Sequence, residues 1–140
     1  ATKIQKLNKK PSTEIILTRD TDKFVSLDER VEFINNLKPD LVISIHVNAS
    51  ENMNARGTEI LISDKNKQRG KSGILALEIY YSLQNQTVEI KHADHYLLKK
   101  VDYPIAIVEL GYLTNEMDRR SLTSEEGQNE IAKALLQALE

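Results

Sequence analysis

Two short and nearly continuous apolar segments constrain the fold of this chain most strongly. Residues 41–46 read LVISIH, and residues 104–110 read PIAIVEL. Short runs of aliphatic residues with almost no polar alternation are typical of strands whose two faces are both covered. Such strands occur in parallel sheets that carry helices on each side. These two segments therefore predict an α/β fold.

The other predicted elements alternate around these two strands. A helix is expected after Ser26, which forms an S-x-x-E capping box with Glu29, and it should end before Pro39. Further strands are expected over residues 14–18 and 58–62. Helices are expected over residues 72–83 and after a second capping box at Thr123 and Glu126. Residues 87–98 are expected to form a loop with a short strand. This alternation predicts a mostly parallel, twisted sheet with helices on both faces, in three layers.

The first ten residues resemble the last turns of a helix. Ile4 and Leu7 lie three positions apart, and basic residues crowd the end of the segment, as is typical of a helix C-terminus. A parallel α/β sheet normally places a strand before such a helix. We therefore expect residues 1–140 to be a single domain that lacks its first strand and most of its first helix.

Composition limits the class of partner. The formal net charge is −2, which argues against nucleic acid, because phosphate binding needs a basic surface. No apolar run reaches the roughly 18 residues of a transmembrane helix, and the chain contains no signal peptide. There is no cysteine, so a metal would have to be held by His, Asp or Glu. The oligomeric state is not specified by the sequence, and a monomer is expected.

His46 and Glu109 stand near the ends of the two most apolar strands, where ligands bind in open parallel sheets. Polar groups at such positions cost stability unless something pairs with them. Zinc would satisfy both, since imidazole binds the metal and a nearby carboxylate accepts a proton from water. The alternative is a histidine bonded to the backbone and a glutamate paired with Arg19 or Arg30. The residues alone leave both interpretations open.

Four motifs carry a resemblance to one family. They are residues 44–49 (SIHVNA, like S-I-H-x-N-A), residues 108–115 (VELGYLTN, like V-E-x-G-[FY]-[IL]-[ST]-N), residues 17–30 (like L-T-R-x-x-D-x-x-[VL]-x-L-x-x-R) and residues 128–134 (QNEIAKA, like Q-x-x-[IA]-A-x-[AG]). In order and spacing they are similar to the bacterial zinc-dependent N-acetylmuramoyl-L-alanine amidases, and they extend over almost the whole chain. The resemblance implies an amidase/phosphorylase-like three-layer fold.

The resemblance also implies residue roles. His46 corresponds to one of three Zn²⁺ ligands and Glu109 to the catalytic glutamate, while Asn48, Arg19 and Arg30 would contact substrate or support the site. The implied reaction is hydrolysis of the amide bond between the lactyl group of N-acetylmuramic acid and L-alanine in peptidoglycan. The implied partner is peptidoglycan or a muropeptide. The implied location is outside the cytoplasm, in the periplasm or cell envelope or secreted.

The chain departs from the family pattern at two ligands. The family's first ligand is a His in a G-H-G-G turn and its second a Glu that opens the first helix, and neither motif is present. An inactive amidase-like module that binds muropeptides or cell wall is therefore an alternative, and an unrelated α/β metallohydrolase is a third. His92 and His95 are expected to be exposed residues and not replacement ligands.

Overall fold

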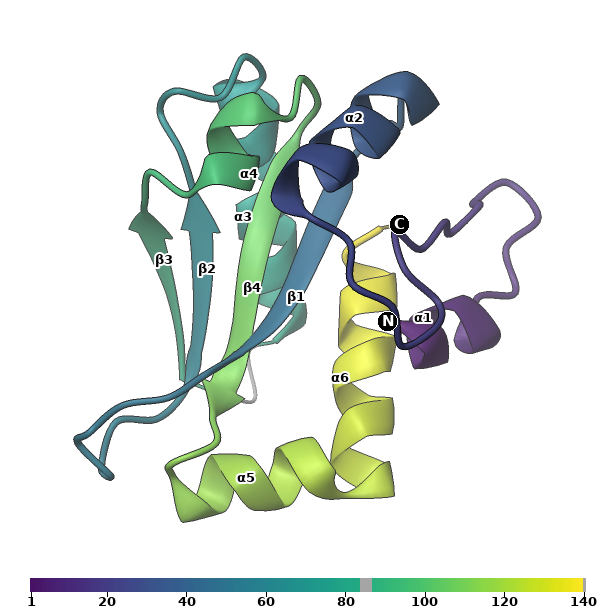
Figure 1. Cartoon of the computed structure of the whole chain (residues 1–140). Coiled ribbons are helices and arrows are strands. Elements are labelled where there is room, and N and C mark those ends of the chain that lie inside the picture. Colours follow the sequence, from purple (N-terminus) through teal and green to yellow (C-terminus); the bar gives the residue numbers. More distant parts are fainter. Residues whose placement is uncertain (84–86, 140) are drawn as a thin grey trace.

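The computed structural model describes residues 1–83 and 87–139. Its sheet has four strands, β1 (Val42–Asn48), β2 (Thr58–Ile62), β3 (Val88–His92) and β4 (Ile105–Tyr112), in the order β1-β4-β2-β3. The pairs β1–β4 and β2–β3 are parallel, and the central pair β2–β4 is antiparallel. The α/β class is thus confirmed, in a mixed sheet (Figure 1).

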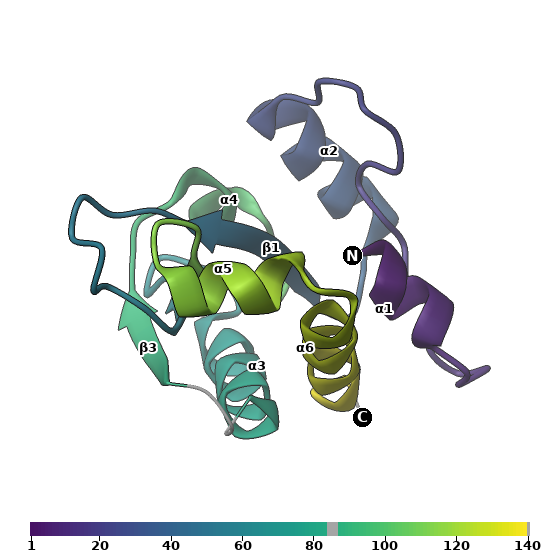
Figure 2. The same cartoon turned by 90° about the horizontal axis from the view of Figure 1, so that it is seen from below.

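Helices cover both faces of this sheet, as predicted. They are α1 (Thr2–Leu7), α2 (Leu27–Leu37), α3 (Arg69–Ser82), α4 (Tyr96–Lys100), α5 (Glu116–Thr123) and α6 (Glu125–Gln137). The view from below places α2 and α4 on one side of the sheet and α3 and α6 on the other (Figure 2). None of the helices in the described residues is long and apolar enough to cross a bilayer.

Each face of the sheet has its own hydrophobic core. On one face, Ile60 and Val108 from the sheet pack with Ile79 of α3 and Leu135 of α6, and all four are fully buried. On the other face, the strand residues Leu61, Ile105 and Ile107 pack with Ile34 of α2 and with Leu97 and Leu98 of α4. The same strands supply both cores because successive side chains point to opposite faces.

The start of α2 follows the predicted capping box. The amide of Glu29 donates to Ser26 Oγ at 3.2 Å, and the amide of Ser26 donates to Glu29 Oε2 at 2.7 Å. Two of the backbone donors at the helix N-terminus are thereby satisfied. The helix ends at Leu37, and its capping residue Lys38, whose φ of 56° is left-handed, stands directly before Pro39.

The strand predicted over residues 14–18 is wrong. The segment is irregular, and Ile16 is exposed. Apolar β-branched residues form a strand only where a neighbouring strand pairs with their backbone, and none of the described strands does so here. Instead, the side-chain amide of Gln5 donates to the carbonyl of Ile15 at 2.9 Å. Ile15 packs against the core of α3 and α6 without belonging to a sheet.

The second capping box is also wrong, by one residue, because an unpredicted helix, α5, ends at Thr123. The hydroxyl of Thr123 donates back to the carbonyl of Arg119, and Ser124 caps α6 by accepting from the amide of Gly127 at 3.0 Å. The turn is tight, since a Cβ on Gly127 would lie 2.3 Å from the carbonyl oxygen of Ser121.

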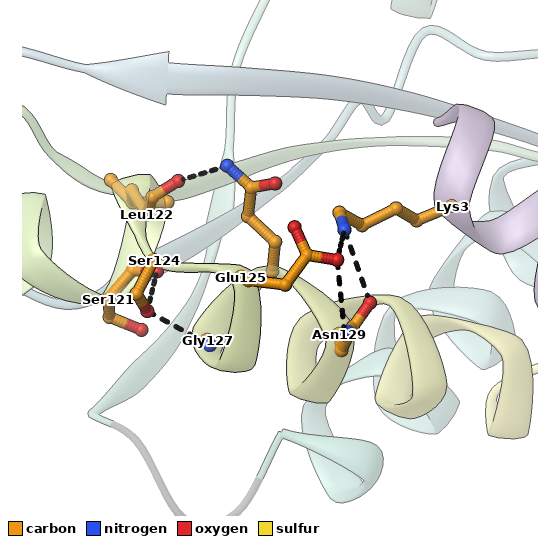
Figure 3. Close-up of polar contacts among 8 residues, drawn as sticks. Lys3, Ser121, Leu122, Ser124, Glu125, Gly127 and Asn129 are labelled. Atoms are coloured by element: carbon orange, nitrogen blue, oxygen red, sulfur yellow. Dashed lines mark hydrogen bonds and ion pairs between the residues drawn. The ribbon is translucent and has the colours of Figure 1, made fainter.

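Helix α1 is tied to the first turn of α6. Lys3 Nζ contacts Glu125 Oε1 at 2.5 Å and Asn129 Oδ1 at 3.3 Å (Figure 3). Ile4 of α1 is buried in the same core as Leu135 of α6. The N-terminal helix therefore packs on α6, on the side of the sheet away from α2 and α4.

Candidate active site

One face of the sheet changes from apolar to polar along each central strand. On β4, Ile105 and Ile107 pack under α2 and α4, and Glu109 follows two residues later on the same face. On β1, Val42 packs against the same core and His46 follows on that face. Figure 1 shows α2 and α4 over the upper part of the sheet, where both strands begin. The polar residues thus lie beyond the helices.

These polar residues form a single row across all four strands. His46 is paired in register with Glu109, Glu109 with Glu59 on β2, and Glu59 with Glu89 on β3. Residues paired in register point to the same face, and neighbouring strands lie about 4.8 Å apart. We call these four residues the charged row. The two predicted site residues are direct neighbours within it.

Glu109 has an oxygen that the protein leaves unpaired. The side chain is half-buried, and Oε2 is the one fully buried side-chain oxygen or nitrogen in residues 1–83 and 87–139 without a hydrogen-bond partner. Leaving a buried polar group unsatisfied costs about 1–3 kcal/mol, and more for a charged one. An unsatisfied carboxylate oxygen at the end of a buried strand makes Glu109 a candidate functional group.

His46 is exposed beside Glu109. Its Nε2 lies 2.8 Å from Ser44 Oγ, a contact in which either atom donates according to the imidazole tautomer. Within the described part of the chain, no group of three or more His, Cys, Asp or Glu side chains is placed to hold a metal. These residues therefore provide one imidazole beside one unpaired carboxylate, and not a complete metal site.

A bulge in β4 adds Tyr112 to this face. The register between β1 and β4 shifts after His46, so that Asn48 is paired with Tyr112 and β4 contains one extra residue. Gly111 provides the bulge with a φ of 148°, which side-chain-bearing residues rarely adopt. Three residues after Glu109, Tyr112 would otherwise face away from it, but here its hydroxyl donates to Glu59 Oε1 at 2.8 Å.

The start of α5 fixes this bulge. Asn115 caps the helix by accepting from the amides of Met117 and Asp118. Asp118 Oδ2 then accepts from the amides of Tyr112 and Gly57, both at 2.9 Å. The VELGYLTN motif therefore has a structural role in addition to placing Glu109, because its glycine, tyrosine and asparagine build the turn that holds the end of β4.

Glu59 and Lys91 were not predicted as site residues. Lys91 Nζ contacts Glu59 Oε1 at 2.5 Å and Glu89 Oε2 at 3.1 Å. The hydrogen bond from Lys91 lowers the pKa of Glu59, and those to Glu59 and Glu89 raise the pKa of Lys91 to about 12. The hydrogen bond to Glu59 raises the pKa of Tyr112. The sequence signal for Glu59 was its position as the single charged residue in the apolar segment TEILI. The residues beside it could not be predicted, because they depend on the order of the strands.

The three remaining predicted residues make their side-chain hydrogen bonds with groups other than His46 and Glu109. Arg19 donates to the carbonyl of Lys23, and Arg30 donates to the carbonyl of Val25 and to Thr18 Oγ1, so both arginines organise the segment before α2. Asn48 Oδ1 accepts from the amide of Ala49 at 2.8 Å, a contact that caps the following loop. Their roles toward substrate stay predictions.

Both other histidines are exposed. His92 Nδ1 lies 3.0 Å from Asp64 Oδ2, and His95 precedes α4 without a side-chain capping bond.

The family model described as N-acetylmuramoyl-L-alanine amidase matches residues 1–140. This chain belongs to the N-acetylmuramoyl-L-alanine amidase family. YqiI of Bacillus subtilis is 33% identical over 129 residues, covering 89% of this chain and 62% of YqiI. The probable cell wall amidase LytH of Staphylococcus epidermidis is 29% identical over 140 residues, covering 99% of this chain and 46% of LytH.

A solved structure shares this fold. The catalytic domain of CwlV, an N-acetylmuramoyl-L-alanine amidase from Bacillus (Paenibacillus) polymyxa var. colistinus, has a TM-score of 0.89 at 28% sequence identity. The match covers 99% of this chain and 77% of the CwlV chain. The chain therefore has the fold of an amidase catalytic domain, while it spans about half to three fifths of the length of the two curated relatives above.

Proposed function

We propose that this chain forms part of a zinc-dependent amidase that hydrolyses the bond between the lactyl group of N-acetylmuramic acid and L-alanine in peptidoglycan. The observation that carries the proposal is the pairing of His46 with Glu109 across β1 and β4, together with the buried and unpaired Glu109 Oε2. Residues 1–140 act in this proposal as one catalytic unit. Its family membership, and the cell wall activity in its relatives' names, support this substrate class.

In this proposal Glu109 moves the proton. Its carboxylate takes a proton from the attacking water, whose oxygen bonds to the lactyl carbonyl carbon. The same carboxyl group then gives the proton to the alanine nitrogen as the carbon–nitrogen bond breaks. The products are the lactyl carboxylate of N-acetylmuramic acid and a peptide with a free N-terminal amine. An oxygen without a partner among the described residues is suited to this task, because none of their hydrogen bonds competes for the proton.

His46 provides one ligand for the metal. Its neutral imidazole is a normal zinc ligand, and Ser44 Oγ at 2.8 Å restrains the ring. When bound, zinc supplies Lewis acidity at the substrate carbonyl and makes water more acidic. The described residues provide one metal ligand, His46, and one proton acceptor, Glu109. They contain no group of three side chains placed to hold a metal. The rest of a three-ligand site is part of the proposal.

The lack of a three-ligand group in the described residues favours a second candidate function. A chain that supplied one metal ligand alone could not hold catalytic zinc, and it would be an amidase-like module that binds muropeptides or cell wall. The unpaired Glu109 Oε2 favours the enzyme, because a binding module has no need to keep a carboxylate oxygen unsatisfied. In either case, we place the protein outside the cytoplasm, where peptidoglycan lies.

Zinc content separates the two candidates. The metal is measured per chain by elemental analysis after purification without chelator, on this chain and on a form that carries any residues encoded before Ala1. His46→Ala is compared with His95→Ala, a matched change at an exposed histidine. The amidase proposal expects about one zinc in at least one of the two forms, lost in His46→Ala and kept in His95→Ala. Absence of zinc from both forms would leave the binding module.

A further inference from the structure

The charged row continues beyond the proposed reaction centre. Glu59 is the direct neighbour of Glu109 on β2, on the side away from His46. Its Oε1 accepts from Lys91 Nζ at 2.5 Å and from the Tyr112 hydroxyl at 2.8 Å. Two donors on different strands hold this carboxylate in one orientation. A group that is already ordered loses little freedom when it binds a ligand.

The second oxygen of Glu59 is open. None of the hydrogen bonds among the described residues reaches Oε2, and Glu109 Oε2 is their single buried unpaired oxygen, so Glu59 Oε2 reaches solvent. The side chain as a whole is 19% exposed. Lys91 lowers the pKa of Glu59 and keeps the carboxylate ionised. The chain thus presents a fixed, charged hydrogen-bond acceptor one strand from Glu109.

The distribution of charge indicates which half of the substrate lies over Glu59. The glycan half is neutral once its lactyl carboxyl is in amide linkage, whereas the peptide half has backbone N–H donors and charged groups. Beyond Glu109, the row continues toward β2 and β3 with Glu59 and Glu89, and Lys91 contacts both of these carboxylates. The opposite neighbour, β1, is the outer strand of the described sheet. Complementarity therefore places the peptide over β2.

The spacing indicates which donor reaches Glu59. Neighbouring strands lie about 4.8 Å apart, and consecutive residues of a peptide lie about 3.8 Å apart. A peptide that leaves Glu109 and crosses the strands therefore brings its next N–H group over Glu59. We propose that Glu59 is a substrate-binding residue that accepts the N–H of the residue after L-alanine, and that Lys91 and Tyr112 position its carboxylate. This inference rests on the proposed amidase function of His46 and Glu109.

The test measures binding of two peptides that have no bond left to hydrolyse. One is L-alanyl-D-isoglutamine, and the other is its depsipeptide analogue, in which an ester oxygen replaces the N–H after alanine. Both are titrated by NMR into the wild-type protein, Glu59→Ala, Glu59→Gln and Glu89→Gln. Glu89→Gln is the matched control, because Glu89 lies in the same row and contacts the same Lys91, one strand further from Glu109.

The wild type is expected to bind the amide about tenfold more tightly than the ester, as for a hydrogen bond to a charged acceptor. Glu59→Ala should abolish this preference, Glu59→Gln should retain about two- to fivefold, and Glu89→Gln should retain all of it. A preference that survives in Glu59→Ala, or a wild type that does not distinguish or bind the peptides, overturns the inference. Glu59→Gln, which keeps size and shape, guards against misfolding of the alanine variant.

Binding is read without turnover, so its outcome is separate from the test of hydrolysis. Hydrolytic activity without an amide preference would contradict only the role of Glu59. An amide preference without hydrolysis would contradict only the proposed reaction.

Discussion

The two faces of the sheet are built from the same strands but serve different purposes. The face toward α3 and α6 is apolar along its length, from Ile43 and Ala106 to Leu110. The face toward α2 and α4 is apolar only as far as Ile107 and then becomes the charged row. The difference lies in helix coverage, because α2 and α4 pack on only the first part of the strands (Figure 1). One face is therefore packed along the whole length of the strands, whereas the other face has a smaller core and leaves its charged residues uncovered.

The largest expected effect on this comparison comes from Glu109. Glu109→Gln should lower the rate of muropeptide hydrolysis by about 10²- to 10⁴-fold, because the amide cannot accept and return a proton. The free energy of unfolding should change by no more than about 1 kcal/mol, since Oε2 has no bond to lose. Turnover is measured by chromatography of the products, and stability by urea titration. A variant that keeps its activity would remove Glu109 from the mechanism.

The apolar face should respond in the opposite way. Ile60→Ala removes a fully buried side chain and should lower the free energy of unfolding by about 2–5 kcal/mol. Glu59→Ala, at the preceding residue on the other face, serves as the control and should cost only about 1 kcal/mol through its contacts with Lys91 and Tyr112. Urea titrations of both variants compare the faces directly. Equal losses would show that the charged row also stabilises the fold.

The bulge in β4, which turns Tyr112 toward the charged row, should be sensitive to a side chain at Gly111. Gly111→Ala puts a Cβ 3.1 Å from Asp118 Oδ2 at a φ of 148°, and should cost about 1–3 kcal/mol of stability. The rate of hydrolysis should fall by more than the loss of folded protein explains, because a shift of the backbone at Gly111 also displaces Glu109 and Tyr112 on the same strand. Gly73→Ala is the control, because its Cβ meets open space within α3 and should stabilise the protein by about 0.5–1 kcal/mol. Circular dichroism melts and initial rates provide the comparison.

The smallest effect concerns the pH dependence of the charged row. Lys91 lowers the pKa of Glu59 in the folded protein, so the ionised group stabilises the fold at pH values above the unfolded pKa, near 4.3. That contribution is lost as the pH falls through the folded pKa. Glu59→Gln should therefore lower the melting temperature at pH 7, with a difference that shrinks below about pH 4. A difference that is constant with pH would show that Glu59 stabilises the fold by packing and not by charge.

The parts of this structure that depend on local sequence could be predicted. The strands of residues 42–48 and 105–112 follow from continuous apolar residues, and the Ser26 capping box sets the start of α2. His46 and Glu109 were predicted as a pair because each stands near the end of one of these strands. Their register pairing confirms that they are neighbours, while their chemical roles stay predictions.

The parts that depend on strand pairing could not be predicted. Glu59 becomes a neighbour of Glu109 only because β2 runs antiparallel to β4, which no local pattern specifies. The face of Tyr112 depends on the bulge at Gly111, and residues 14–18 have strand-forming residues but no strand beside them. Helix α5 was missed because it is short, and because Met117 and Leu122 are its apolar residues, which are too few to establish a helical period.

Hydrolysis in ¹⁸O-labelled water most directly tests the central claim, that His46 and Glu109 take part in cleaving the lactyl–alanine amide bond. The zinc-supplied protein, with any residues encoded before Ala1, is incubated with N-acetylmuramoyl-L-alanyl-D-isoglutamine in H₂¹⁸O, and the products are identified by mass spectrometry. We predict N-acetylmuramic acid labelled once in its lactyl carboxyl group and unlabelled L-alanyl-D-isoglutamine, with both products formed about 10²- to 10⁴-fold more slowly by Glu109→Gln. Intact substrate in the presence of zinc-bound wild-type protein, or label in the dipeptide, would contradict the assignment of His46 and Glu109 to this reaction.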